Sequence, residues 1–273
     1  MHGSQKIQVI SFDGLNQRSR ADVVVQEEPL ELRLEMAGTR QTVYTTMRTA
    51  GHDFELALGW CLSEGIISKL EDVAKVSYCL PKKLEQRFNI VNLKLRNGLI
   101  VAVDKRHTLS TSACGVCGKA NLEALEMHCQ PIQSQVQIAP DTLYALPDKL
   151  RAAQTIFEST GGIHAAGLFS SQGDLLALRE DVGRHNAVDK LIGWAIMQPQ
   201  NLEQTILLVS GRVGFEIAQK AIQAQIPVLA SVSAPSSLAI DVAKHFDLTL
   251  IGFLRGQKMN LYAGAKRIGG TAT

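Results

Sequence analysis

The sequence predicts an α/β protein in which a small strand-rich α+β domain precedes a larger α/β domain. Extended runs dominate the chain up to Val103, whereas helices and strands alternate from Asp141 onward. The runs 206–209 and 227–230 are apolar without interruption, and each is followed by a helical pattern. Strands of this kind belong to a parallel sheet that is buried on both faces. We expect a flexible N-terminal segment and two domains, with the bounds 1–20, 21–110 and 111–273.

Length and composition indicate a globular chain with a substantial core. Of its 273 residues, 45% are hydrophobic and 20% are charged, and the net charge of +2 does not favour nucleic acid or a membrane surface as a partner. No apolar run approaches the ~18 residues of a membrane span, and the chain does not begin with a signal-type segment. Five cysteines, an odd number, fit reduced thiols better than a disulfide framework. We therefore expect a soluble protein of the cytoplasm.

The first part of the chain has the pattern of strands around one helix. Asp53 is a helix N-cap, and Gly65 ends that helix. Pro29 interrupts the ladder between the strands on either side of it, and Asn97-Gly98 has the composition of a type I′ hairpin turn. The expected strands are 22–26, 30–36, 41–47, 73–80 and 88–95, and a polar loop at 104–118 precedes a short helix at 119–129.

The second part alternates between helical and extended patterns. The resulting order of elements is that of a βαβαβ arrangement with a parallel sheet. The expected helices are 141–158, 184–197, 213–225 and 236–246, and the expected strands are 163–170, 174–179, 205–210, 227–232 and 248–253.

The sharpest local signal is the pair of cysteines in Cys114-Gly115-Val116-Cys117. Such a pair can be half of a zinc site, a redox dithiol, a nucleophilic pair that carries sulfur, or two inert loop cysteines. A closed zinc site needs four ligands, but there is no second pair, and the nearest candidates are His107, His128 and Cys129. A thioredoxin-like dithiol would directly follow a strand, whereas here a long polar loop comes first.

Charge around the pair favours a reactive thiol. The pair leads into a helix that starts near Lys119, and the dipole at the start of a helix stabilises a thiolate. The basic residues 105–107 lie upstream in the same loop. Since a thiolate is the nucleophilic form, this loop is the best candidate for covalent sulfur chemistry. Cys61 and Cys129 lie on apolar helix faces and are predicted to be core residues.

A second signal is spread over three strand ends. Ligands of open α/β sheets bind outside the carboxyl ends of the strands, where helix N-termini attract phosphate. Helix capping is an alternative explanation of the serines at these ends, but it does not explain Arg212 and Arg255. The segment 179–190, which includes His185, adds many polar side chains around Gly183 and is a candidate lining. A phosphate or nucleotide crevice is therefore predicted at the strand ends 209–212, 232–237 and 252–256, which include Gly211, Arg212, Ser233, Phe253, Leu254, Arg255 and Gly256.

Together, these segments resemble the FdhD family over nearly the whole chain after about residue 20. The motifs similar to those of the family are Glu27-Glu28-Pro29-Leu30, Met47-Arg48-Thr49-Ala50-Gly51-His52-Asp53, Glu64-Gly65-Ile66-Ile67, Cys114-Gly115-Val116-Cys117-Gly118, Thr160-Gly161-Gly162-Ile163-His164, the segment 179–190, Ser210-Gly211-Arg212, Ser233-Ala234-Pro235 and Gly252-Phe253-Leu254-Arg255.

The resemblance implies a fold and an activity. The larger domain would be a cytidine-deaminase-like α/β/α domain, and the protein would be a sulfurtransferase and a homodimer. A cysteine desulfurase would form a persulfide on Cys114, near Cys117, and the sulfur would pass to Mo-bis(molybdopterin guanine dinucleotide) for formate dehydrogenase. GDP-like nucleotides would be partial mimics of this substrate. The segment 253–258 would be its first contact, with Gly211, Arg212, Ser233 and His185 beside it, and the protein would bind no zinc.

Two alternatives belong to other classes of protein. A zinc-dependent deaminase-like hydrolase needs a His-x-Glu motif and a Pro-Cys-x-x-Cys motif. Here Ala165-Ala166 follows His164, and Ala113 precedes Cys114, so the glutamate and the proline of those motifs are missing. The other alternative is a non-catalytic chaperone of formate dehydrogenase that performs no sulfur chemistry.

Overall fold

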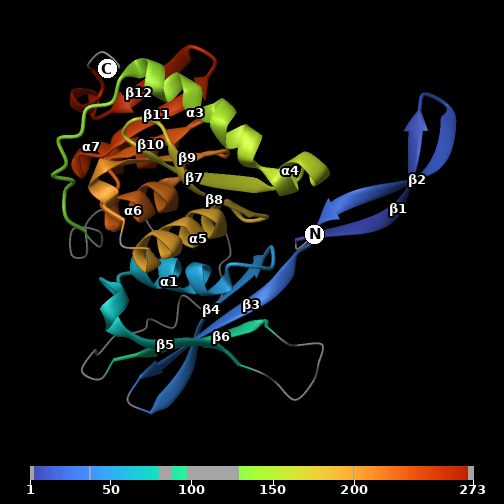
Figure 1. The fold of residues 1–273 in the computed structure, drawn as a ribbon, viewed down its shortest axis with the longest axis horizontal. Helices are drawn as coiled ribbons and strands as arrows, with labels where there is room; N and C mark the ends of the chain where they lie inside the picture. The colour runs from blue at the N-terminus through green and yellow to red at the C-terminus, as the bar shows by residue number, and fades with distance from the viewer. Residues whose placement is uncertain (1–2, 37, 80–87, 97–128, 199, 270–273) are drawn as a thin grey trace.

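The computed structural model describes residues 3–36, 38–79, 88–96, 129–198 and 200–269, which form three sheets and the helices around them (Figure 1). A ribbon pairs β1 with β2, a second sheet has the order β4-β3-β6-β5, and a third has the order β12-β11-β10-β9-β7-β8. The strands are β1 (Ser4–Asp13), β2 (Asn16–Val25), β3 (Glu28–Met36), β4 (Thr39–Arg48), β5 (Val73–Tyr78), β6 (Ile90–Leu95), β7 (His164–Ser170), β8 (Leu175–Asp181), β9 (Thr205–Val209), β10 (Val228–Ser231), β11 (Thr249–Arg255) and β12 (Lys258–Ala263). The helices are α1 (Asp53–Ser63), α3 (Pro140–Ala153), α4 (Thr155–Thr160), α5 (Arg184–Met197), α6 (Phe215–Gln223) and α7 (Ser237–His245), with 3₁₀ turns η1 (Leu70–Asp72), η4 (Leu202–Gln204) and η5 (Ala265–Arg267).

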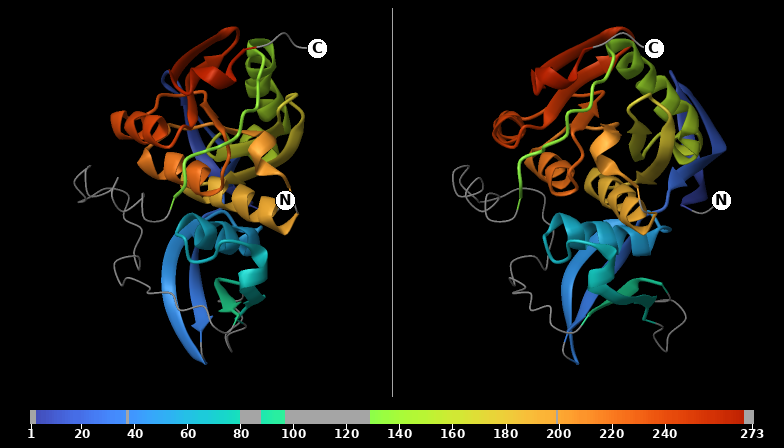
Figure 2. Two further views of the ribbon diagram at one scale, coloured as in Figure 1. Left: turned by 90° about the vertical axis from the view of Figure 1, so that its left-hand side faces the viewer. Right: turned by 60° about the vertical axis from the view of Figure 1, so that its left-hand side comes forward.

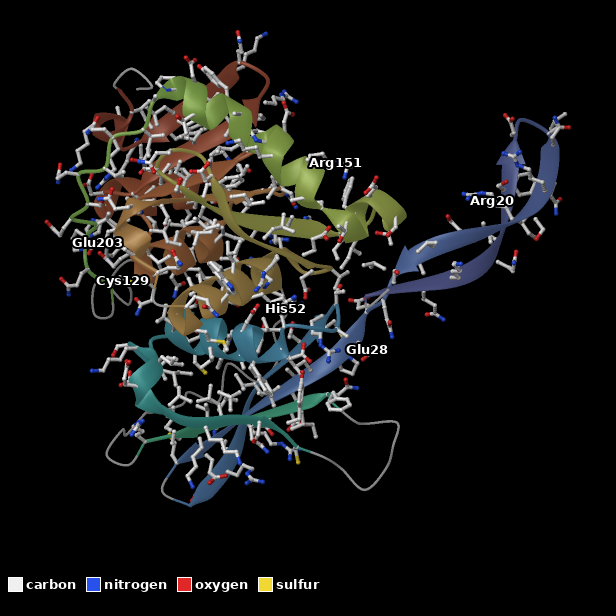
Figure 3. The ribbon with its side chains drawn as sticks, in the orientation of Figure 1. Arg20, Glu28, His52, Cys129, Arg151 and Glu203 are labelled. Carbon is white, nitrogen blue, oxygen red and sulfur yellow. The ribbon has the colours of Figure 1, made fainter. Side chains whose placement is uncertain are left out.

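The ribbon replaces the flexible segment that the sequence predicts over residues 1–20. Its strands pair without a break from Ser4 opposite Val25 to Asp13 opposite Asn16, and Gly14 (φ +62°) is the first residue of the two-residue turn. Asp-Gly and a glycine at this turn position are hairpin signals, which the polar composition of the segment conceals. Only its base packs on the body, where β2 contacts α4, so that Arg20 lies far from both larger sheets (Figure 3).

The four-stranded sheet has β3 and β6 as its central strands, and β3 contributes to its buried side. Strand β3 pairs antiparallel with β4 and parallel with β6, and its inward side chains Leu30, Leu32 and Leu34 are buried. Contrary to the prediction, Pro29 does not interrupt the strand. Pairing with β6 begins only at Glu31, so the missing N–H of Pro29 removes no hydrogen bond from that ladder.

The six-stranded sheet has the predicted parallel centre. Strands β9, β10 and β11 are parallel neighbours, and every residue of β9 and β10 is buried. Strands β7 and β8 continue the sheet antiparallel on one side, and β12, which the sequence pattern does not predict, closes the other side. The observed architecture is therefore mixed α/β with several sheets, while the cytidine-deaminase-like description stays a prediction.

Helices cover both faces of the six-stranded sheet. On one face, Leu143, Leu146 and Leu150 of α3 share a core with alternate residues of the strands, and α5, α6 and α7 pack on the other face. The predicted helix 141–158 is divided at Gln154, which has non-helical dihedral angles. The buried carboxylate of Glu180 accepts hydrogen bonds from the backbone N–H groups of Ile156 and Phe157, both 2.9 Å, and so caps a new helix, α4.

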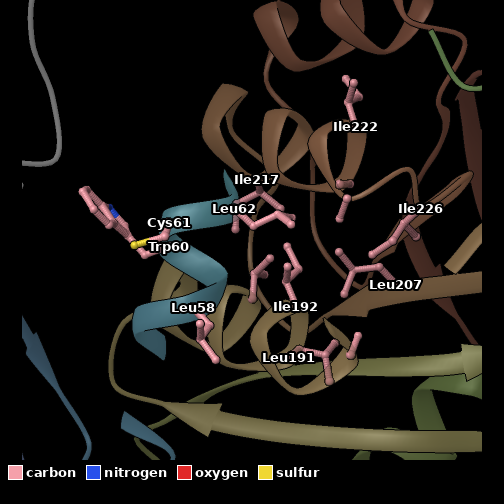
Figure 4. Packing of buried hydrophobic residues seen from close by; sticks show 14 of the residues in the cluster. Leu58, Trp60, Cys61, Leu62, Leu191, Ile192, Leu207, Ile217, Ile222 and Ile226 are labelled. Atoms are coloured by element: carbon pink, nitrogen blue, oxygen red, sulfur yellow. The ribbon is translucent and has the colours of Figure 1, made fainter. Parts of the chain in front are cut away.

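Helix α1 joins the small sheet to α5 in a close crossing. One buried cluster runs from Leu32 of β3 through α1 to Leu191 of α5. Figure 4 shows a part of this cluster, with Leu58 and Leu62 of α1 and Leu191 of α5. A Cβ atom on Gly59 would overlap the carbonyl of Asp189, and a Cβ atom on Gly193 would overlap the carbonyl of Glu55. Figure 2 shows α1 between the small sheet and α5 in both views. The layers are thus α3, the six-stranded sheet, α5 with its neighbours, α1 and the four-stranded sheet.

Some expectations fall on residues that the structure does not describe. These are the Asn97-Gly98 turn, the loop 104–118 with Cys114 and Cys117, the helix expected over 119–129 except Cys129, and the domain boundary at 110. None of the described helices is both long and apolar enough to cross a membrane.

Candidate functional site

The ends of β9, β10 and β11 bring most of the predicted crevice residues together. The Ser231 hydroxyl donates to the Gly211 carbonyl at 2.6 Å and accepts from the backbone N–H of Ser233 at 2.9 Å. The Phe253 N–H donates to the Ser233 carbonyl at 3.0 Å. These bonds connect the three loops into one edge, so Gly211, Ser233 and Phe253 are close together because their strands are parallel neighbours.

The β11–β12 turn carries the exposed part of this edge. Phe253 (φ +53°) and Gly256 (φ +52°) have left-handed backbones, and the Arg255 guanidinium lies 6.0 Å from the centre of the Phe253 ring. Arg255, Gly256, Gln257 and Lys258 are exposed, and so is Arg212 in the neighbouring loop. Leu254 corrects the prediction, because its side chain is fully buried in the core and supports the turn from inside.

His164 joins this edge from β7. Because β7 runs antiparallel to β9, its first residues lie beside the end of β9, where the Ala165 N–H donates to the Ser210 hydroxyl at 2.9 Å. A Cβ atom on Gly211 would be 3.2 Å from Nδ1 of His164, so glycine permits this approach. Burial, together with the nearby Arg184 guanidinium, lowers the pKa of His164. The imidazole is therefore neutral at pH 7.

His185 lies in the first turn of α5 and contacts α6. Nε2 of His185 is 3.0 Å from Oε2 of Glu216, in the first turn of α6. This contact lowers the pKa of the Glu216 carboxyl. His185 thus lies beside the start of α6, and it lines a cavity together with Thr46 and Met47 of β4.

A buried ion pair fixes the loop before α5. Nζ of Lys190 is 2.6 Å from Oδ2 of Asp181 and donates to the Thr49 carbonyl at 2.8 Å. Asp181 also accepts from the backbone N–H groups of Thr49 and Gly183 and from the side chain of Asn186. Asp181 and Lys190 are almost completely buried, so they connect β4 to the start of α5 without contact with solvent.

Two cavities lined by described residues adjoin His164 and Val182. The first, the α3–α4 cavity, has a volume of about 610 Å³, and its lining includes Arg151, Gln154, Phe157, Gly161, Gly162, Ser210 and Val232. The second, the β4–α5 cavity, has a volume of about 420 Å³, and its lining includes Tyr44, Thr46, Met47, Arg184, His185 and Asn186. His164 and Val182 line both, so the edge of the sheet has a cavity on each side of these two residues.

The two buried cysteines in the part of the chain that the structure describes are poor candidates for a reactive thiolate. Cys61 and Cys129 are buried, as predicted, and burial raises the pKa of Cys129 to about 11 and that of Cys61 well above its usual range. The thiol of Cys129 lies 2.9 Å from Oε1 of Gln223. Cys79 is half-buried. Cys114 and Cys117 lie outside the described residues.

The edge and its cavities define a mixed α/β protein with a candidate binding site at the ends of parallel strands. Comparison with known proteins identifies the family. The FdhD/NarQ family model matches residues 25–269, and the chain belongs to this family.

Relatives match along most of the chain. The sulfur carrier protein FdhD of Mycolicibacterium paratuberculosis is 50% identical over 92% of this chain and 93% of its own. Proteins of the same name from Streptomyces coelicolor and Sulfurisphaera tokodaii are 48% and 41% identical over 92% and 97% of this chain, and over 90% and 98% of their own. A crystal structure from Desulfotalea psychrophila, described as a formate dehydrogenase accessory protein, has the same fold, with a TM-score of 0.77 at 20% identity over 98% of this chain and 100% of that one.

Sequence reasoning missed several residues of this region. His164 lies at the start of a strand, whereas ligand sites of open α/β sheets are expected at the carboxyl ends of strands. The glycine pair Gly161-Gly162 before it could have indicated a close approach of the backbone to a site. Gln154 and Arg151 lie in what reads as an ordinary amphipathic helix. Their position beside the edge depends on the break between α3 and α4, which is caused by Glu180 from another strand.

Proposed function

We propose that the protein is a cytoplasmic sulfur carrier, a sulfurtransferase that serves formate dehydrogenase. The observation that carries this proposal is the similarity, along nearly the whole chain, to proteins named sulfur carrier protein FdhD. The sequence supplies a suitable thiol pair in Cys114 and Cys117. Burial makes the thiols of Cys61 and Cys129 unsuited to the role.

Sulfur transfer requires two steps, each with a defined leaving group. The Cys114 thiolate attacks the terminal sulfur of a persulfide on a cysteine desulfurase, a new S–S bond forms, and the desulfurase cysteine leaves as a thiolate. The substrate Mo-bis(molybdopterin guanine dinucleotide) then accepts this sulfur at its metal. The S–S bond on Cys114 breaks, the cysteine leaves as a thiolate, and the metal centre supplies the two electrons that convert the sulfur to sulfide.

Substitution of the two cysteines tests the carrier role. Cys114→Ala should abolish persulfide labelling after incubation with a desulfurase, and it should abolish activation of formate dehydrogenase. Cys117→Ala should keep the label, because the persulfide forms on Cys114, and should impair transfer to some degree. In the wild type, Cys117 must be held back from the Cys114 persulfide, since its attack would form a disulfide and lose the sulfur as sulfide. Normal labelling and activation with Cys114→Ala would refute the assignment. Activation without any persulfide on the wild-type protein would favour a chaperone instead.

The strand-end edge is the proposed site for the guanine nucleotide part of this substrate. Exposed Arg212, Arg255 and Lys258 surround the hydrogen-bonded loops of Gly211, Ser233 and Phe253, which suits a diphosphate. GDP should bind as a partial mimic, and Arg212→Ala or Arg255→Ala should each weaken its binding about tenfold or more in calorimetry. Unchanged affinity in both variants would place the nucleotide elsewhere.

A homodimer and complexes with cysteine desulfurase and formate dehydrogenase complete the proposal. The ribbon supports self-association, since Ile10 and Phe12 are 61% and 68% exposed on a face that holds no charged residue in the outer half of the ribbon. The charged residues Asp13, Arg18 and Arg20 alternate onto the other face. Light scattering should give a dimer for the wild type and a smaller mass for Phe12→Asp.

A further inference from the structure

The outer side of β12 (residues 258–263), here called the β12 edge, is an unpaired strand edge. β12 is the last strand on its side of the six-stranded sheet, and within the described residues no backbone hydrogen bond joins it to an element other than β11. Figure 2 shows this strand at the outer margin of the sheet, away from the small sheet. The outward N–H and C=O groups of β12 can therefore pair with an added strand, as in peptide recognition by strand addition.

β12 also has an apolar side chain that the core does not cover. Met259 and Leu261 are two residues apart and so lie on the same face of the strand. Met259 packs against the core that α3 shares with the sheet, whereas Leu261 is 38% exposed and belongs to neither buried cluster. An added strand could place an apolar side chain of its own beside Leu261.

The charges around β12 select the kind of strand that can be added. Asp247 is the last acidic residue of the chain, and its Oδ2 atom already contacts Lys266 at 2.5 Å and Arg267 at 3.0 Å. Arg255 and Lys258, before and at the start of β12, are exposed and form no ion pair with any described residue. Lysine at a strand edge discourages pairing with neutral or basic strands, so an acidic strand suits this edge.

The same charges disfavour a second copy of this chain on the β12 edge. Antiparallel pairing about a two-fold axis at the middle of β12 would bring the end that carries Arg255 and Lys258 to the end of the other copy that carries Lys266. Like charges that face each other on neighbouring strands are destabilising. The charges therefore favour a different protein with acidic side chains.

The place of β12 in the fold indicates which protein this is. β12 continues from the turn whose exposed cations, Arg255 and Lys258, belong to the strand-end edge. A protein that receives a ligand from the strand-end edge must approach this turn, and the β12 edge is then the neighbouring surface that it meets.

We propose that the β12 edge docks formate dehydrogenase by pairing with an extended acidic segment of that protein. The inference rests on the proposed function, in which formate dehydrogenase receives the cofactor from the strand-end edge. Backbone hydrogen bonds would supply affinity, and acidic side chains next to Arg255 and Lys258 would supply specificity and a fast association. Persulfide formation and nucleotide binding do not need this docking, so they can be measured separately from it.

Leu261→Glu and Leu261→Lys form a matched pair of variants at the middle of the β12 edge. Both remove the exposed leucine, but only glutamate repels an acidic strand. The probe is the fluorescein-labelled peptide acetyl-Glu-Val-Glu-Val-Glu-Val-amide, measured by fluorescence anisotropy at low ionic strength. The wild type should bind it, Leu261→Glu should weaken binding about tenfold or more, and Leu261→Lys should have a clearly smaller effect. Both variants should keep the thermal midpoint of the wild type, because Leu261 lies outside the buried clusters.

Two altered peptides separate strand addition from simple attraction of charges. N-methylation of the two central residues blocks both edges of the peptide, because neighbouring N–H groups point to opposite sides of a strand, and it should abolish binding. The counterpart with lysine in place of glutamate should not bind either. Equal binding of the N-methylated peptide, or no binding of the parent peptide to the wild type, would overturn the proposal.

Activation of formate dehydrogenase tests the identity of the partner. Leu261→Glu should lower activation severalfold relative to Leu261→Lys, while persulfide labelling and GDP binding stay at the wild-type level. Equal activation by the two variants would overturn the docking assignment and leave the proposed function intact. A smaller mass of Leu261→Glu than of the wild type in light scattering would assign the edge to a second copy and would also overturn it. If the wild type carries no persulfide, the proposed function fails, and the peptide assay still reports on the edge independently.

Discussion

Removal of the Lys190 ammonium should strongly destabilise the connection between β4 and α5. In Lys190→Met, Asp181 stays fully buried and loses the cation 2.6 Å away, and the Thr49 carbonyl loses its side-chain donor. Breaking one partner of a buried ion pair costs about 3–5 kcal/mol. Asp181 keeps donors from the backbone of Thr49 and Gly183 and from Asn186, so we expect the lower end, about 3 kcal/mol.

Urea unfolding followed by circular dichroism measures this loss. With a slope of about 3 kcal/mol per molar urea, the midpoint should fall by about 1 M. Lys244→Met, at an exposed lysine of α7, is the control and should stay within about 0.5 kcal/mol of the wild type. Adding Asp181→Asn to Lys190→Met should cost less than the two single changes together, since the buried charge is then gone. A loss below about 1 kcal/mol in Lys190→Met, or full additivity, would refute the reasoning.

Three further predictions concern other buried contacts. Gly59→Ala should lower stability by about 3 kcal/mol in urea unfolding, because α1 and α5 must separate, whereas Gly162→Ala has free space and should be near neutral. Burial lowers the pKa of His164, so its contribution to the free energy of unfolding is complete above about pH 6.5 and is lost as the pH falls below that value. Between about pH 7.5 and 5.5, the urea midpoint of the wild type should therefore decline more than that of His164→Asn. Arg267→Met should cost about 3 kcal/mol, because a fully buried guanidinium donates to backbone carbonyls on both sides of it, while exposed Lys266→Met should cost little.

The parallel core was predictable because its signals are local. The strands β9, β10 and β11 and the helices between them follow from apolar runs and turn residues in the sequence itself. The helix predicted over 184–197 has those bounds in the structure, since it follows a glycine and is apolar along most of its length. The adjacency of Gly211, Ser233 and Phe253 then follows from the geometry of parallel strands.

What could not be predicted depends on contacts between distant segments. The break at Gln154 is imposed by Glu180, and the strand β12 is largely exposed and lacks an apolar pattern. Leu254 was assigned to ligand contact because it lies at a strand end, in a segment similar to the family. The irregular backbone at Phe253 (φ +53°), where the pairing with β12 shifts register, turns its side chain into the core shared with Ile251. The two cavities beside His164 arise only when β7 is paired antiparallel to β9.

The crossing of α1 and α5 restricts how this protein can diverge. At both Gly59 and Gly193 the obstacle to a side chain is a backbone carbonyl of the opposite helix. Because backbone atoms block both positions, smaller side chains around them create no room. A substitution of Gly59 therefore cannot be compensated by a substitution of Gly193. We expect lineages to retain both glycines while surface residues and loop lengths change around them. The distance between the small sheet and the strand-end edge should then be inherited as a constant, however far the sequences drift apart.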